Sequence, residues 1–379
     1  MDTLYLAAVC AVLPGLRRST ITEILKKLSS SKALFEASEE ELLATGLVEP
    51  KQLTQFITKR RLDMPEKLDR FCKANSVKLV SIFDGAYPKV LKEIHDPPLV
   101  LYVKGEIPQA NYAIGIVGSR ECSYYGLKAA SVFSAELAKE GIPIISGGAK
   151  GIDTAAHEAA LKAGGTTVAV LGCGLDIAYP SSNKYLFQRI AERGAVISEY
   201  PPGTEPRAMN FPARNRIIVG LSRGIVVAEA ARKSGALITA HIAADEGREV
   251  YCVPGNIFEG SSIGCHELIR TGAKLVDNVQ DILEDKLQWQ IAMQRNFEQP
   301  SLFAEPKRKR KRRPVIIEKP LPESELGQKI WGLLKQGPLS LEDITEQLEE
   351  SIPVISMELL ELQIQGYVDQ DKAQRYFRL

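Results

Sequence analysis

The spacing of apolar residues predicts short helices over the first part of the chain. Apolar side chains recur every three or four positions, as in Ile21 and Ile24, with polar residues between them. Breaks that contain Gly15 and Gly46 separate these stretches. The pattern predicts a small helical domain over residues 1–72.

The first break in this region, LPGLRR, is similar to the turn of a helix-hairpin-helix motif, whose backbone amides can meet a DNA phosphate. Arg17 stands where such a turn usually has its second glycine. Two interpretations stay open, direct DNA contact or a small helical packing module, and the packing module is favoured.

Between residues 77 and 280 apolar strands alternate with helical stretches, at the intervals of βαβ units. Several strands are unbroken apolar runs, which is typical of parallel strands covered on both faces. We therefore predict an α/β fold with a doubly wound, Rossmann-like sheet over residues 73–299. The expected strands are Ala113–Val117, Pro143–Ser146, Thr167–Leu171, Ala195–Ser198, Ile225–Ala228 and Val250–Val253, with helices at Leu127–Lys139, Ala155–Ala163 and Leu186–Arg193.

Residues 300–323 form a linker rich in Pro, Lys and Arg, including the run KRKRKRR. Such a run cannot bury itself, so it acts either as a solvated tether or as a nonspecific grip on phosphates. The pattern of residues 324–379 predicts a winged helix, with three helices and a hairpin. Its third helix carries Glu358 and Glu361 but no Lys or Arg, which favours protein docking over DNA reading.

Two glycine-rich turns follow strands and open helices, in IGIVGSR and IPIISGGAKGID. Backbone amides at the start of a helix lack partners and lie at the positive end of the helix dipole, so they bind anions. Serine hydroxyls and cationic side chains add further donors for phosphate oxygens. The candidate phosphate-binding residues here are Gly118, Ser119, Arg120, Ser146, Gly147, Gly148, Lys150 and Gly151.

Three other segments offer similar donors. FPARNRIIVGLS places Arg214, Asn215 and Arg216 near a helix start, where both arginines are expected to project from the first turn. EAARKSGALITA caps a helix with Ser234 and Gly235, and YPSSNKYL presents Lys184. One mononucleotide needs one or two such turns, whereas four or five suggest consecutive phosphates of a nucleic-acid strand.

Other residue patterns narrow the class of protein. There is no GxxxxGK[ST] motif, and Gly115 and Gly118 do not fit GxGxxG, which argues against Walker-type hydrolases and NAD or FAD. No cofactor is expected. The net charge of +1 drives no global attraction to nucleic acid, so any basic surface is local. Six scattered cysteines without a CxxC pair and the lack of a long apolar run predict a cytoplasmic protein with no membrane insertion.

Several side chains have two possible roles. Asp153 and His157 lie four residues apart and form either a metal pair or, as we favour, a helix cap and a buried polar group. Glu199 and Glu229 end strands; they act either as acid and base or, as favoured, pair with arginines such as Arg214.

Three aromatic residues also have two possible roles. Tyr124, Tyr125 and Phe211 either stack on bases or pack in the core. The spacing of the residues leaves both roles open.

These segments, in this order, resemble the DprA (Smf) family of bacterial DNA-processing proteins. The resemblance covers about residues 85–275, through YPKVLKEIHDPPLVLYVKG, GIVGSR, SGGAKGID, AVLGCGLDIAYPSSNKYL, ISEYPPG, FPARNRIIVGLS, SGALITA, VPGN and LIRTGA. It implies a non-enzymatic, homodimeric protein that binds and protects single-stranded DNA and helps to load the RecA recombinase during natural transformation. It further implies that the candidate residues, from Ser119 to Arg216, hold DNA phosphates. His266 stands where some members carry Asn.

Two other classes of protein remain as alternatives. Strand-end glutamates beside glycine-rich turns also resemble the LOG-like nucleotide phosphoribohydrolases, although their PGGxGTxxE signature is absent. A protein-interaction scaffold centred on the winged helix is the third hypothesis.

Overall fold

The computed structural model describes residues 3–12, 18–28, 30–47, 50–298, 322, 324–335, 337–348, 350–365, 367–370 and 375–378. The chain divides into two compact units, Met1–Gln299 and Pro300–Leu379, each described below by itself. The helix-hairpin-helix turn and the basic run expected from the sequence lie outside the described residues.

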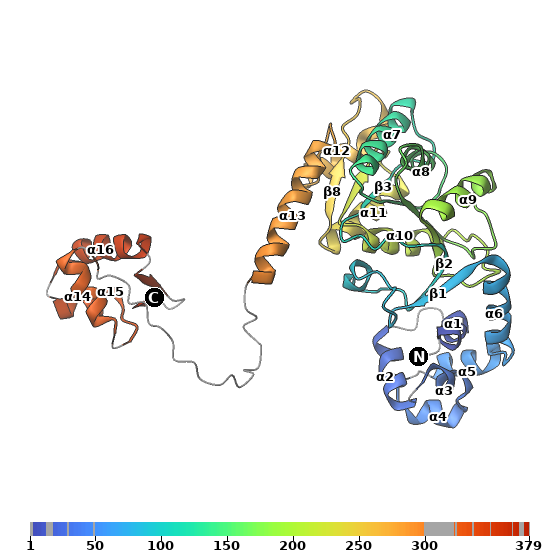
Figure 1. The fold of residues 1–379 in the computed structure, drawn as a ribbon, viewed down its shortest axis with the longest axis horizontal. Helices are drawn as coiled ribbons and strands as arrows, with labels where there is room; N and C mark the ends of the chain where they lie inside the picture. The colour runs from blue at the N-terminus through green and yellow to red at the C-terminus, as the bar shows by residue number, and fades with distance from the viewer. Residues whose placement is uncertain are drawn as a thin grey trace. The chain divides into compact units, whose positions relative to one another are not determined.

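The first unit begins with short helices whose apolar faces meet in one core (Figure 1). Phe35 and Phe56 pack edge to face at its centre, with ring centroids 6.5 Å apart. This core continues without a break into the sheet that follows, so the boundary expected near residue 72 stays a prediction. The helices are α1 (Thr3–Val12), α2 (Arg18–Leu28), α3 (Ser31–Glu36), α4 (Glu39–Ala44), α5 (Pro50–Lys59) and α6 (Met64–Asn75).

A nine-stranded sheet forms the centre of this unit, in the order β1-β2-β6-β5-β4-β3-β7-β8-β9. The pairings β1–β2 and β2–β6 are antiparallel, and all the others are parallel. The strands are β1 (Val77–Ser81), β2 (Val100–Gly105), β3 (Ile114–Val117), β4 (Ile144–Ser146), β5 (Thr167–Leu171), β6 (Ala195–Ser198), β7 (Gly224–Val227), β8 (Glu249–Cys252) and β9 (Lys274–Leu275).

Helices cover both faces of the sheet because buried side chains alternate along each strand. In β7, Ile225 and Val227 pack with α10 and α11, whereas Val226 packs with α7 and α8 on the other face. The helices of this region are α7 (Tyr124–Lys139), α8 (Ile152–Lys162), α9 (Lys184–Arg193), α10 (Asn210–Leu221), α11 (Gly235–Asp245), α12 (Ile263–Arg270) and α13 (Gln280–Glu298), with one-turn helices η1 (Val90–Glu93), η2 (Ser181–Asn183) and η3 (Gly260–Ser262).

The order of the strands creates a switch point between β3 and β7. From β3 the chain adds β4, β5 and β6 on one side, and then returns to place β7 on the other side. In open α/β sheets ligands bind beyond the carboxyl ends of the strands at such a point. The predicted α/β, Rossmann-like fold is confirmed, although the antiparallel strands β1 and β2 were not expected.

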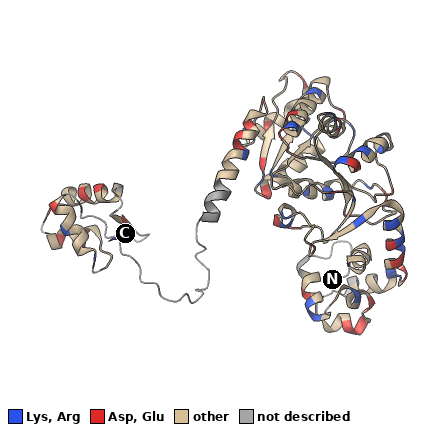
Figure 2. Cartoon of the chain, viewed as in Figure 1, with Lys and Arg blue, Asp and Glu red and all other residues tan. Residues whose placement is uncertain are grey.

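The second unit contains the predicted winged helix, with helices α14 (Glu325–Leu333), α15 (Leu341–Leu348) and α16 (Ile352–Ile364) and a hairpin of β10 (Val368–Gln370) and β11 (Tyr376–Arg378). Ile344, Ile355 and Leu359 are fully buried in its core. Acidic residues colour part of α16 red in Figure 2, and this helix also exposes apolar side chains, including Met357, which is 72 % exposed.

Among the helices in the described part of the chain, none has the length and apolar character needed to span a membrane.

Candidate functional site

A cavity of about 780 Å³ lies at the carboxyl ends of the central strands, at the switch point. Its walls come from all five strand-to-helix connections between β3 and α11. They include residues 117–121 after β3, Ala149 after β4, Tyr179 after β5, Pro206 after β6 and residues 233–235 after β7. Segments far apart in the sequence therefore meet at one edge of one sheet.

The structure brings half of the predicted site residues to this cavity and leaves the others outside its lining. Those in the lining are Gly118, Ser119, Arg120, Arg214, Asn215, Ser234 and Gly235. Those outside it are Ser146, Gly147, Gly148, Lys150, Gly151, Lys184 and Arg216. Lys150 and Lys184 are nevertheless exposed to solvent. Lys150 lies in the loop between β4 and α8, and Lys184 is the first residue of α9, so both lie at the same edge of the sheet as the cavity.

The turns after β3 and β4 touch each other through backbone, and glycine makes this contact possible. A Cβ on Gly151 would lie 2.5 Å from the carbonyl oxygen of Ser119, and Gly151 also has a φ of +76°. The Ile152 amide donates a hydrogen bond to the same oxygen, with an N···O distance of 3.3 Å. Gly151 therefore holds the loop that carries Ser119 and Arg120 in place.

The turn after β4 is not the open anion site that the sequence predicted. The amides of Gly147 and Ala149 both donate to Asp153 Oδ2, at 3.1 and 3.3 Å. The hydroxyl of Ser146 is buried and donates to the Ile116 carbonyl. The carboxylate of Asp153 thus occupies the position expected for a ligand phosphate.

The position and the burial of Arg214 also differ from the prediction. Helix α10 begins at Asn210, so Arg214 lies in its second turn and not in the first. Its side chain is 4 % exposed, and its Nη1 donates to the carbonyl oxygens of Gly147, at 2.7 Å, and Val170. Burial lowers the pKa of Arg214 to about 10, and Asp153 opposes that shift. Burial raises the pKa of Asp153, and the positive charge of Arg214 opposes this rise.

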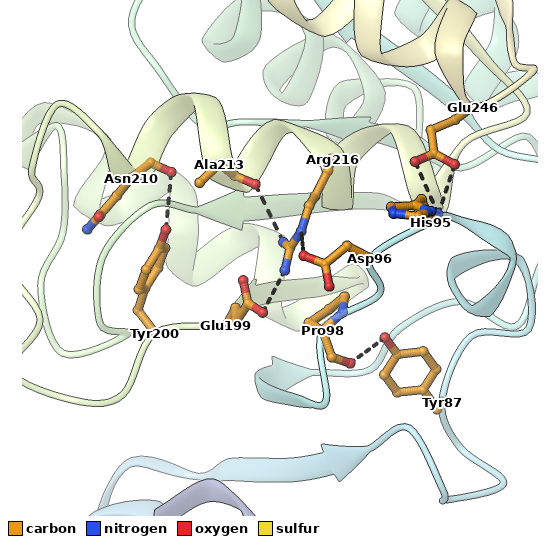
Figure 3. A network of polar contacts seen from close by, with 10 residues as sticks. All are labelled: Tyr87, His95, Asp96, Pro98, Glu199, Tyr200, Asn210, Ala213, Arg216 and Glu246. Atoms are coloured by element: carbon orange, nitrogen blue, oxygen red, sulfur yellow. Dashed lines mark hydrogen bonds and ion pairs between the residues drawn. The ribbon is translucent and has the colours of Figure 1, made fainter. Parts of the chain in front are cut away.

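Arg216 is not part of the cavity lining and lies in a polar network with Glu199 and Asp96 (Figure 3). Its guanidinium pairs with Glu199 at 2.7 Å and with Asp96 at 3.2 Å. The expected pairing of a strand-end glutamate with an arginine is therefore present for Glu199, through Arg216 and not Arg214. Glu229 is fully buried and instead accepts hydrogen bonds from the amide and hydroxyl of Ser123. The lining of the cavity includes neither glutamate, so the geometry lends no support to their use as acid and base there.

An aromatic pair with a cation above it forms one wall of the cavity. The rings of Phe211 and Tyr179 lie 5.4 Å apart between centroids, with a tilt of 34°. The Arg120 guanidinium carbon lies 5.1 Å from the centroid of Phe211. Of the three aromatic candidates, only Phe211 lines the cavity, whereas the Tyr125 hydroxyl donates to the Pro254 carbonyl.

Sequence reasoning missed Tyr179 and Lys233, which both line the cavity. Tyr179 is 42 % exposed, and Lys233 is exposed directly before the helix cap Ser234. Both lie inside segments already singled out, so adjacency to those helix starts was the available signal. Their positions give the cavity a second exposed cation, beside Arg120, and a second aromatic ring.

Helix starts at this edge differ in how they are capped. The Ser234 hydroxyl accepts from the Ala236 amide at the start of α11, as predicted. In the part of the chain that the structure describes, no side chain caps α8, α9 or α10. The first amide of each of these helices nevertheless donates to a backbone carbonyl oxygen, Ile152 to Ser119, Lys184 to Ser181 and Asn210 to Arg207. The lack of a side-chain cap therefore does not by itself leave these first amides open to an anion.

His157 is the buried polar group that we favoured, whereas Asp153 does not cap helix α8, whose N-cap is Gly151. His157 is fully buried, with Nδ1 2.7 Å from the Thr167 hydroxyl. That hydroxyl donates to the Ile144 carbonyl, so His157 carries its proton on Nδ1. Burial lowers the pKa of His157 to about 3. Within the described residues no group of three or more His, Cys, Asp or Glu side chains is arranged to hold a metal ion.

The molecule thus combines a doubly wound, Rossmann-like sheet with a cavity at the switch point that cations and aromatic rings line. Sequence profiles match the family "DNA recombination-mediator protein A" over residues 78–286 and the "DprA winged helix domain" over residues 318–373. The chain belongs to the DNA recombination-mediator protein A family, known as DprA or Smf, as the resemblance of its motifs implied.

Individual relatives agree with this assignment. The chain is 50 % identical to the DNA processing protein DprA of Streptococcus pneumoniae over 206 residues, which are 54 % of this chain and 73 % of that protein. It is 34 % identical to the protein Smf of Synechocystis over 94 % of each chain.

Two solved structures are also similar. The X-ray structure of DprA from S. pneumoniae aligns with a TM-score of 0.64 and 39 % identity, covering 75 % of this chain and 98 % of that one. The structure of DprA from Helicobacter pylori, reported with its single-stranded DNA binding mode, aligns with a TM-score of 0.51 and 31 % identity. The alignment covers 56 % of this chain and 96 % of that one.

Proposed function

We propose that this chain binds single-stranded DNA in the cavity at the switch point and acts without catalysis in DNA recombination. The observation that carries this proposal is the convergence of five connections on one cavity that combines exposed cations with an aromatic pair. The single-stranded DNA binding mode described for the H. pylori relative supports it.

The proposed contacts divide by chemistry. Arg120 and Lys233 neutralise phosphates, and the hydroxyl of Ser234 and the amide of Gly235 donate hydrogen bonds to phosphate oxygens. The amide and hydroxyl of Ser119 donate instead to the carbonyl oxygens of Glu229 and Glu121, which fixes the loop that carries Arg120. Phe211 and Tyr179 offer ring faces on which an unpaired base stacks, and such stacking tolerates any base. Lys150 and Lys184 reach the backbone of a strand that extends beyond the cavity.

Backbone contacts of this kind carry little sequence information, so the protein is expected to bind most single strands alike. The stacking component distinguishes single from double strands, because the bases of a duplex are already stacked on each other.

The finer parts of the proposal come from the family. We propose that the protein works in the cytoplasm as a homodimer, protects incoming single strands during natural transformation and helps to load the RecA recombinase on them. A dimer presents two cavities, which allows one protein to hold two segments of a strand. The winged helix, with its acidic and apolar outer helix, is proposed to dock a protein.

Fluorescence anisotropy with labelled single- and double-stranded oligonucleotides of equal length tests the proposal. The expected result is tighter binding of the single strand, with affinity that falls steeply as salt rises. Equal binding of the duplex, or no binding of either, would overturn the proposed function. Stimulation of RecA filament formation on strands coated with single-strand-binding protein tests the loading role separately.

A further inference from the structure

The backbone of Gly147 is held at both its N–H and its carbonyl oxygen by buried charged side chains. Its N–H donates to Asp153 Oδ2 at 3.1 Å, and its carbonyl oxygen accepts from Arg214 Nη1 at 2.7 Å. A Cβ on Gly147 would lie 2.6 Å from Arg214 Nη2 and 2.8 Å from Asp153 Oδ2, so only glycine fits between them. We call Asp153, Gly147 and Arg214 the loop clamp.

The clamp also reaches the neighbouring strands and the rest of the turn. Arg214 donates to the Val170 carbonyl at the end of β5 and, through Nε, to Asn215 Oδ1 at 3.2 Å. Asp153 accepts from the Ala149 amide. Through these bonds the turn after β4 has one fixed conformation relative to α10, and Asn215 is oriented at the cavity wall.

Charge and burial set the clamp apart from the exposed cations. Arg214 belongs to the cavity lining but is only 4 % exposed, and its guanidinium already donates to three acceptors and lies near the Asp153 carboxylate. A buried arginine with these partners gains little from a phosphate, because approach of the phosphate would require desolvation and loss of existing bonds.

We propose that Asp153 and Arg214 are positioning residues that hold the turn after β4 for DNA, and that neither side chain contacts DNA. This inference rests on the proposed function of the cavity. It assigns the phosphate contacts to exposed residues such as Arg120 and makes Asp153, an acidic group, a requirement for binding an anionic ligand.

The salt dependence of DNA binding distinguishes a residue that positions the turn from a residue that contacts a phosphate. Each phosphate contact on a single strand contributes about 0.7 to the slope of log K against log salt, so loss of a contact lowers the slope by that amount. Loss of a positioning residue weakens binding but leaves the slope unchanged. The full-length chain is titrated with a labelled 20-nucleotide oligothymidylate at several salt concentrations, as wild type and as Arg214→Met, Asp153→Asn, the double variant and Arg120→Ala.

The clamp predicts that Arg214→Met and Asp153→Asn each weaken binding by at least about tenfold with an unchanged slope, because misplacement of binding groups by about 1 Å is costly. The double variant is expected to bind no more weakly than the worse single variant, since both remove one unit. Arg120→Ala is expected to lower the slope by about 0.7.

Three results would overturn the clamp: a slope reduced by about 0.7 in Arg214→Met, tighter binding by Asp153→Asn, or additive losses in the double variant. Should Arg214→Met fail to fold, Arg214→Lys decides, because lysine keeps a cation for a phosphate but lacks the planar guanidinium fork that joins Gly147, Val170 and Asn215. Wild-type affinity in Arg214→Lys would reject positioning, and a tenfold loss supports it. Failure of the wild type to bind the oligonucleotide would instead reject the proposed function.

Discussion

Replacement of Gly151 by alanine tests the contact between the two turns on which the cavity depends. The added Cβ would lie 2.5 Å from the Ser119 carbonyl oxygen and 2.7 Å from that of Arg120, both of them backbone atoms. Ordinary contact begins at 3.4 Å, so the loop has to move by about 1 Å. In addition, the φ of +76° and ψ of −123° are a conformation that costs a residue with a side chain about 1–3 kcal/mol.

We therefore expect Gly151→Ala to reduce the free energy of unfolding by about 3 kcal/mol or more, combining backbone strain with the displaced loop. DNA binding should weaken by at least about tenfold, because Ser119 and Arg120 move with that loop. Urea denaturation measures the first effect, and fluorescence anisotropy with single-stranded DNA measures the second.

Gly247→Ala is the matched control, since Gly247 has a φ of +65° but no atom within 4 Å of its ideal Cβ. It should cost about 1 kcal/mol of stability and leave DNA binding unchanged. If Gly151→Ala proves no more harmful than this control in either assay, the proposed contact between the turns is wrong.

Three further variants have defined outcomes. Because burial lowers the pKa of His157 to about 3, the folded state resists protonation of this side chain, and the free energy of unfolding should fall by about 1.4 kcal/mol per pH unit as the pH drops from about 6.5 towards 3. His157→Gln should flatten this pH dependence in urea titrations. An equally steep loss of stability in the variant would contradict the role of His157. Phe211→Ala should cost about 1–3 kcal/mol of binding with an unchanged salt slope, and full affinity by anisotropy would exclude stacking. Arg216→Ala should leave the salt slope unchanged because Arg216 pairs with Glu199 and Asp96; a slope lower by about 0.7 would show a phosphate contact instead.

The parallel strands could be predicted because each is a short, unbroken apolar run. β5 and β6 begin and end at the predicted residues, since both faces of each strand are buried. The antiparallel strands β1 and β2 were not predicted: β1 mixes exposed and buried positions, whereas β2 does contain the apolar run VLYV, which was overlooked. The antiparallel pairing of β1 with β2 and of β2 with β6 depends on tertiary structure that local patterns do not encode.

At the site, the pattern of donors predicted which turns meet, but not which donors are already occupied. Asp153 was expected to cap a helix, yet its carboxylate instead accepts hydrogen bonds from the amides of the preceding glycine turn. The start of α10 at Asn210 moved Arg214 into the second turn, where the sheet buries it. Whether a cation faces solvent or a carbonyl depends on such shifts of a few residues, which periodicity does not resolve.

The central claim is that phosphates bind at the switch-point cavity, where Arg120 and Lys233 are the exposed cations of the lining. The double variant Arg120→Ala, Lys233→Ala removes both charges. Its matched control, Lys139→Ala, Lys162→Ala, removes two exposed cations from the last turns of α7 and α8, at the opposite edge of the sheet.

The most direct measurement is the slope of log affinity against log salt for single-stranded DNA in these two variants and the wild type. The account predicts a slope lower by about 1.4 for the cavity variant and no change for the control. Equal slopes in all three proteins, or a reduced slope only in the control, would contradict DNA binding at this cavity.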